Sequence, residues 1–239
     1  MRRSRVIAAV GAVSAAAVSA ASIAVPTTAQ ARTSLDRLQR VGGHLRAAAV
    51  AWPTRAVDLH AAPGSRRVVA RVERRTRFGT PTALAVSRVE GRWAEVMSST
   101  LPNRTHAYVR LADVVLTYDP VTLELDLSRH QLLAWRGNEL LRAIPVATGS
   151  PVSPTPLGRY AVTDKLTNFD AFAYGCCVLA LSGHQERLAP GWHGGDRLAI
   201  HGGGGIGESI SSGCIHARES DLHWLLRRVP LGTQITIHP

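Results

Sequence analysis

A cysteine and a histidine near the C-terminal end of the chain have the residue types and the spacing for nucleophilic catalysis. Cys214 lies in the segment Ser211-Ser212-Gly213-Cys214-Ile215-His216, and His201 ends an apolar run 13 residues earlier. A catalytic thiol needs a nearby base, and backbone N–H groups must receive the oxyanion that its attack creates. The glycine-rich stretch after His201 can fold back and bring Cys214 beside the imidazole, and Gly213 allows the backbone to approach a reacting carbonyl. We therefore predict a His201–Cys214 pair.

These residues stand in a longer set of ordered motifs. Residues 117–239 resemble the L,D-transpeptidases of bacterial cell walls, the YkuD-type catalytic domain. The resemblance rests on His201-Gly202, Ile206-Gly207, Ser211-Ser212-Gly213-Cys214-Ile215-His216, Val146-Ala147-Thr148-Gly149, Pro154-Thr155-Pro156-Leu157-Gly158-Arg159-Tyr160 and a closing segment from Leu222 to Ile237. The chain departs from the family where His216 replaces the usual Arg or Asn, and where the glycine loop after His201 is short. Both departures bear on substrate and acceptor choice.

The resemblance implies a reaction on peptidoglycan stem peptides. Cys214 would attack the carbonyl of the third residue of a tetrapeptide stem and expel the terminal D-alanine, with His201 as the base. The Gly202 carbonyl would orient His201, and the N–H groups at Gly213 and Cys214 would bind the oxyanion. Transfer to the amine of another stem gives a 3-3 crosslink. Substrate contacts are expected from three residues: Ser211, Ser212 and His216.

Two rival functions remain open beside the transpeptidase. Water as the acceptor would make the same site an L,D-carboxypeptidase, and loss of activity would leave a wall-binding protein. The reaction needs no metal and no organic cofactor. His201, Cys214 and His216 could be read as zinc ligands, but their spacing is looser than structural zinc sites show.

The remaining cysteines and histidines receive no catalytic role. Three cysteines are an odd number, so at least one thiol is free or pairs between molecules. Cys176 and Cys177 are expected to be structural, either as buried thiols or with one bonded to a partner. His184 and His193 either line the cleft or sit on the surface.

The elements that must position the pair are mostly strands. Leucines alternate with acids over 123–127, and apolar runs at 132–135 and 140–146 flank an Arg-Gly-Asn turn, which predicts a hairpin. Apolar residues at 222, 225, 226 and 229 predict one helix that Pro230 ends. Short strands over 56–116 resemble a bacterial SH3-like domain. We predict a mainly β protein, with a small SH3-like barrel before a β-rich L,D-transpeptidase domain at 117–239.

The N-terminal residues predict export. Residues 1–31 have a basic start, an apolar run and an A-x-A site, as in a cleaved signal peptide, and 32–55 is predicted to be a linker. Lys+Arg number 28 against 17 Asp+Glu, a net charge of +11, which falls to +8 without the signal peptide. We therefore expect a secreted protein of the cell wall or periplasm, with anionic wall polymers as a further partner. Nucleic acid is excluded, and a membrane is a partner only if the signal peptide is retained.

Overall fold

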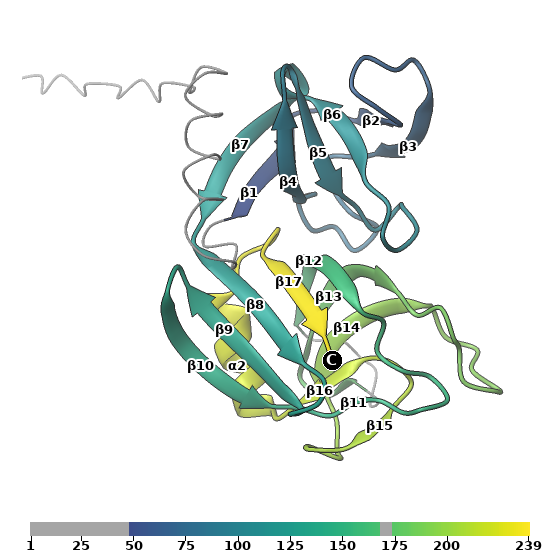
Figure 1. Cartoon of the computed structure of the whole chain (residues 1–239), viewed down its shortest axis with the longest axis vertical. Coiled ribbons are helices and arrows are strands. Elements are labelled where there is room, and N and C mark those ends of the chain that lie inside the picture. The colour runs from purple at the N-terminus through teal and green to yellow at the C-terminus, as the bar shows by residue number, and fades with distance from the viewer. Residues whose placement is uncertain (1–47, 168–173) are drawn as a thin grey trace, which may run out of the picture.

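A computed structural model describes residues 48–167 and 174–239, which form two lobes connected by a single strand-to-strand passage at Pro120 (Figure 1). The predicted signal peptide, 1–31, lies outside the described residues, as do residues 32–47 of the predicted linker. In the described part of the chain, no helix has the length and apolar character needed to cross a membrane.

The N-terminal lobe is a seven-stranded antiparallel sheet with strand order β3-β2-β6-β5-β4-β1-β7. Its core holds Leu59, Leu84, Val96 and Val109, which are almost fully buried. The strands are β1 (Ala48–Pro53), β2 (Val57–His60), β3 (Val68–Val72), β4 (Leu84–Glu90), β5 (Trp93–Met97), β6 (Ala107–Arg110) and β7 (Val114–Asp119), with a 3-10 turn, η1 (Leu111–Asp113), before β7.

The prediction of a linker over 32–55 is wrong for residues 48–53, because these residues form β1, an internal strand of this sheet. It lies between β4 and β7, and Ala49, Val50 and Ala51 are each at most 1% exposed. A strand buried on both faces shows no alternation, and its small residues resemble a spacer in composition. The sheet also continues through β7 to Asp119, so the boundary lies three residues beyond the predicted one. The SH3-like resemblance of this lobe stays a prediction.

The C-terminal lobe is an eight-stranded mixed sheet with strand order β10-β9-β8-β17-β12-β13-β14-β16. Two pairs, β8 with β17 and β14 with β16, are parallel. The strands are β8 (Val121–Asp126), β9 (Gln131–Arg136), β10 (Glu139–Pro145), β12 (Gly158–Thr167), β13 (Cys177–His184), β14 (Arg197–Gly202), β16 (Ile215–Ala217) and β17 (Gln234–His238), and a separate two-stranded parallel sheet joins β11 (Thr148–Gly149) to β15 (Ser209–Ser211).

The predicted helix is confirmed as α2 (Glu219–Arg228), the one α-helix among the described residues. Leu222 and Leu225 of this helix are fully buried, and the helix packs on β13 and β14. The predicted hairpin is also present, since β9 pairs with β10 across the turn at Gly137. The fold is therefore mainly β with one helix, as predicted.

The two lobes contact each other through buried polar and apolar groups. The Gln234 side-chain amide donates to the Val86 carbonyl at 3.0 Å. Asn103 makes two hydrogen bonds to the backbone of His184, at 2.7 and 2.8 Å. A small apolar cluster of Ala85, Met97 and Ala161 completes the contact. These contacts set the N-terminal lobe against β12, β13 and β17 of the C-terminal lobe.

Candidate active site

The parallel pairing of β14 with β16 places the predicted residues next to one another. His201 is in register with His216, and Ile200 with Ile215. Residues in register share a face of the sheet, and residues two apart on one strand share it as well. Cys214 therefore lies on the same face as His216 and His201. Ile200, Ile215 and Ala217 point to the opposite face, where they are buried in the core.

A cavity of about 260 Å³ opens on this face. His201, Cys214 and His216 all line it, together with Ser211 and Ser212. The structure thus brings together the predicted base, the predicted nucleophile and the three predicted substrate-contacting residues. Leu188, Trp192 and Ile210, which are 40–50% exposed, form an apolar part of its wall.

The turn that carries Cys214 is fixed by hydroxyl groups. The Ser211 hydroxyl donates to the Cys214 carbonyl at 2.6 Å and accepts from the Gly213 N–H at 3.1 Å. Thr155 Oγ1 donates to the Gly213 carbonyl at 3.0 Å. The Gly213 N–H, one of the two predicted oxyanion donors, is therefore already bonded to Ser211. The oxyanion role of either group stays a prediction.

Gln185 supports the same turn from the other side. Its side-chain amide donates to the carbonyls of Ser153, Pro154 and Ser212 at 3.0–3.3 Å. Gly213 has a φ of 106°, and a Cβ there would lie 1.8 Å from Gln185 Nε2. Position 213 therefore requires glycine both for its backbone conformation and for the close approach of Gln185.

His201 is oriented by its own strand and is neutral at ordinary pH. Its Nδ1 lies 2.7 Å from the Gly202 carbonyl, which fixes Nδ1 as the donor and leaves Nε2 as the acceptor. Burial lowers the pKa of His201 to about 4, and nearby His216 lowers it too, while the Gly202 hydrogen bond opposes them. The predicted contact with the Gly202 carbonyl is present, and its catalytic meaning stays a prediction.

The thiol of Cys214 is also neutral in the resting site. Burial raises its pKa, and a hydrogen bond from the Ala199 backbone opposes this only in part. The Sγ atom lies 3.9 Å from the Arg197 carbonyl, which accepts a weak hydrogen bond from the thiol. Since the pKa of the imidazole is low and that of the thiol is high, the resting pair consists of a thiol and a neutral imidazole.

Tyr174 and His216 confine the imidazole from two sides. The Tyr174 ring meets that of His201 edge-on, with centroids 4.8 Å apart, and the His216 ring lies at the same separation. A Cβ at Gly202 would lie 3.0 Å from the Gly175 Cα, so glycine at both positions permits the turn before β13 to approach the end of β14. His216 Nδ1 bonds to the Gly204 carbonyl at 3.1 Å, so His216 also holds the glycine loop.

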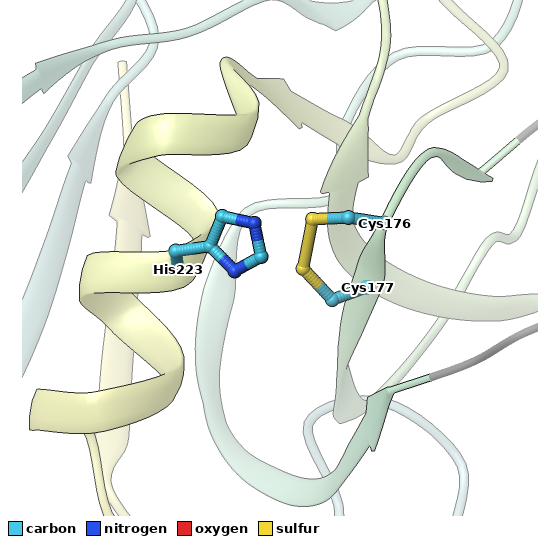
Figure 2. Close-up of side chains that lie close together, drawn as sticks. All are labelled: Cys176, Cys177 and His223. Carbon is cyan, nitrogen blue, oxygen red and sulfur yellow. A yellow bond between two sulfur atoms is a disulfide. The ribbon is translucent and has the colours of Figure 1, made fainter.

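The other two cysteines are joined to one another. Cys176 and Cys177 form a disulfide, and the His223 ring of α2 faces it (Figure 2). Both predicted alternatives, buried free thiols or a bond to a partner, are therefore wrong, because the neighbouring sulfurs pair within the chain. This leaves Cys214 as the free cysteine. Cys176, Cys177 and His223 are the one close group of potential metal ligands in the described residues, and its sulfurs are bonded to each other.

The structure places all four histidines that were predicted at or near the site. His201, Cys214 and His216 do not form a close metal-ligand group among the described residues. His184 does not line the cavity but bonds to the Ser99 carbonyl and to Asp196 at the contact between the lobes. His193 is exposed outside the cavity lining.

Several residues of the site were not predicted. Thr155 lies in the Pro154–Tyr160 motif, so the sequence carries a signal for its position near the site. Gln185, Tyr174 and Arg197 reach the cavity only through folding of distant segments, and the sequence carries no local pattern that marks them.

The C-terminal lobe is a mainly β domain with a cysteine and a histidine on one face of its sheet, both lining a cavity. These features are those of a cysteine-dependent enzyme domain. Residues 120–237 match the family model of the YkuD-type L,D-transpeptidase catalytic domain, and this domain of the chain belongs to that family. Proteins of the family act on the stem peptides of peptidoglycan.

Individual relatives are distant. The curated YkuD proteins of Bacillus licheniformis and Bacillus subtilis are each 27% identical over 120 and 119 residues, which is 50% of this chain and 67% and 66% of theirs. A solved structure, an L,D-transpeptidase from Mycobacterium smegmatis, is 17% identical with a TM-score of 0.41, and the match covers 65% of this chain and 82% of that one.

The pKa of His201 predicts a specific pH dependence of stability. An unfolded histidine titrates near 6.5, whereas His201 titrates near 4 in the native state, so between these values only the unfolded chain binds this proton. The free energy of unfolding should therefore fall as the pH drops through this window, by about 3 kcal/mol for this residue. Urea unfolding of the protein and of His201→Gln between pH 7 and pH 4 measures it. The variant should lose less stability over the window; equal losses would contradict the depressed pKa.

Proposed function

We propose that the protein is an exported cysteine acyltransferase that forms 3-3 crosslinks between peptidoglycan stems. The observation that supports it most is the shared face of β14 and β16, on which His201 and Cys214 line one cavity. The family acts on stem peptides, and the two residues have the chemistry of a nucleophile and its base.

The first half-reaction follows from the neutral resting pair. Cys214 Sγ bonds to the carbonyl carbon of the third stem residue, while His201 Nε2 accepts the thiol proton. The tetrahedral oxyanion is held by the backbone N–H of Cys214, a type of contact often worth about 3 kcal/mol. When the intermediate collapses, the C–N bond to the terminal D-alanine breaks, and His201 returns the proton to the departing amine. The product is a thioester on Cys214.

The second half-reaction reverses these roles. The side-chain amine of a second stem attacks the thioester carbonyl, and His201 Nε2 accepts one amine proton. The C–S bond then breaks, and the proton returns to the sulfur. The new amide joins the third residue of one stem to the third residue of the other. Water in place of the amine gives the carboxypeptidase product, a stem shortened to a tripeptide.

Ser212 and His216 are proposed to contact the substrate, since both line the cavity. Ser211 lies in the same lining, but its hydroxyl is already used twice within the turn, so its contribution is to hold Cys214. His216 stands where an arginine is usual in the family and is uncharged unless protonated. With Nδ1–H donating to the Gly204 carbonyl, Nε2 of the neutral ring accepts a hydrogen bond from the substrate, and it donates one only when the ring is protonated.

Purified tetrapeptide muropeptides test this function. The wild-type protein should convert them to crosslinked dimers with release of D-alanine, and Cys214→Ala should produce neither, because the thioester cannot form. Mass spectrometry of the products reads the outcome. Tripeptides without dimers would replace the transpeptidase with the carboxypeptidase alternative. Unchanged tetrapeptides would contradict both enzymes and favour the wall-binding alternative.

The cell wall or periplasm is the proposed location, with anionic wall polymers as a second partner. The N-terminal lobe carries a group of exposed arginines, close together in the sequence, that we name the arginine face. Its members are exposed and come from β3 and the segments on either side: Arg66, Arg67, Arg71, Arg74, Arg75 and Arg77. Arg71 pairs with Asp58 at 2.8 Å, and within the described residues no ion pair to a carboxylate is found for the other five. Guanidinium groups suit phosphate geometry, which favours a phosphodiester polymer.

Binding to such a polymer should depend on salt and on this face. Arg66, Arg67 and Arg74 changed together to Gln should weaken co-sedimentation with purified wall teichoic acid at low salt. A matched variant that changes Arg136, Arg227 and Arg228 to Gln loses the same charge from the other lobe and should bind like the wild type. Equal weakening of both variants would show that net charge, and not the arginine face, governs binding.

A further inference from the structure

One contact between the lobes reaches a buried acid, Asp164, which pairs with Arg197 at the start of β14. Thr76, in the segment after β3, donates its hydroxyl to Asp164 Oδ1 at 2.5 Å. Asp164 belongs to β12 and is only 1% exposed. Its second oxygen has no hydrogen-bond partner and lies 3.7 Å from the Arg197 guanidinium. A buried carboxylate with one hydrogen bond and one ion pair depends strongly on each of them.

A bulge in the sheet aims this acid at Arg197. Between β12 and β13 the register passes from Val162–Leu181 to Asp164–Ala180, so Thr163 is an extra residue in β12. A bulge re-aims the side chains beside it. Here the Arg197 guanidinium reaches both neighbours, because it donates to Thr163 Oγ1 at 2.7 Å and pairs with Asp164.

Arg197 also makes a hydrogen bond at a second register shift of the sheet. The register of β13 with β14 shifts between Ala180–Ala199 and His184–Arg197, which interrupts the ladder around Leu181. Arg197 Nε donates to the Leu181 carbonyl at 2.8 Å and so satisfies a buried acceptor at this irregularity. The guanidinium therefore anchors the first residue of β14 to both β12 and β13.

This anchored residue touches the catalytic pair through its backbone. The Arg197 carbonyl accepts the hydrogen bond from the Cys214 thiol, and Arg197 also lines the cavity. His201 lies four residues further along the same strand. A shift of Arg197 would move the acceptor of the thiol and the start of the strand that presents the imidazole.

We propose that Thr76 of the N-terminal lobe is a positioning residue for catalysis, acting through Asp164 and Arg197 on Cys214. This inference rests on the proposed function for its kinetic part but not for its effect on the thiol. Without the Thr76 hydroxyl, Asp164 Oδ1 loses its donor in a buried place, and the carboxylate turns toward the guanidinium to recover one. Arg197 then loses its hydrogen bond to Thr163 or to Leu181, and the start of β14, beside the cavity, is held less firmly.

Three variants separate this role from general docking of the lobes. Thr76→Val keeps the shape but removes the hydroxyl, and Thr76→Ser restores it. Gln234→Leu is the control, because it removes a hydrogen bond between the lobes, to the Val86 carbonyl, and one from Arg159 within the C-terminal lobe, without touching Asp164 or Arg197. Thermal unfolding of each variant reports the stability that each change costs.

The first readout is the alkylation of Cys214 by iodoacetamide across a range of pH. Cys214 is the one free cysteine of the chain, so the rate reports its thiol alone. Loosening at Arg197 admits water and weakens the burial that raises the pKa of the thiol, so Thr76→Val should move the profile to lower pH. Thr76→Ser and Gln234→Leu should follow the wild-type profile. An unchanged profile for Thr76→Val, or an equal shift for Gln234→Leu, would overturn the proposal.

The second readout is the steady-state reaction with tetrapeptide muropeptides. Misplacement of the reacting groups acts on the chemical step, so Thr76→Val should lower kcat by about tenfold with little change in KM. Thr76→Ser should restore kcat. A change confined to KM, or a failure of Ser to restore kcat, counts against a positioning role. If the wild type converts no tetrapeptide, the proposed function fails, and the alkylation profiles still decide whether Thr76 controls Cys214.

Discussion

The structure of the site depends on one interaction, the parallel pairing of β14 with β16. This register sets His201 beside His216 and puts Cys214, which directly precedes β16, on the same face. A shift by one residue would turn Cys214 into the core and expose Ile215. The surrounding contacts stabilise the segments at which the two paired strands begin. Ser211, Thr155 and Gln185 fix the turn before β16, while Arg197 fixes the start of β14.

Burial on this face determines how the pair can react. The same enclosure lowers the pKa of His201 and raises that of Cys214, so both effects favour uncharged groups. An ion pair of thiolate and imidazolium would need a more polar surrounding, and nearby His216 opposes it further. In the proposed mechanism the proton therefore moves during attack, and the Gly202 carbonyl keeps Nε2 of His201 available to accept it. This separates the domain from cysteine enzymes that store a thiolate beside a cation.

The sequence predicted those helices and strands that bury one side and expose the other, because such elements have a periodic apolar pattern. The alternating leucines of β8, the hairpin of β9 with β10, and the apolar stripe of α2 are visible in sequence because each element buries one side. The strand β1 was missed because it is buried on both sides and made of small residues. At the site, His201 and Cys214 were predictable from their motif. Asp164 and Arg197 were not, since their roles arise at two register shifts that only the paired sheet reveals. Gln185 was not, because folding brings it to the turn from a distant segment.

The ionisation state of Cys214 is the most direct test of this account, because the mechanism rests on a neutral resting pair. Ultraviolet absorbance of the thiolate can be followed from low to high pH in the wild type, with Cys214→Ala as the blank. Burial predicts no thiolate at neutral pH and its appearance only above about pH 8.5, the ordinary pKa of a cysteine. A thiolate band that is already present at neutral pH and disappears only on acidification, as the sulfur gains a proton, would show a stored ion pair and contradict the account.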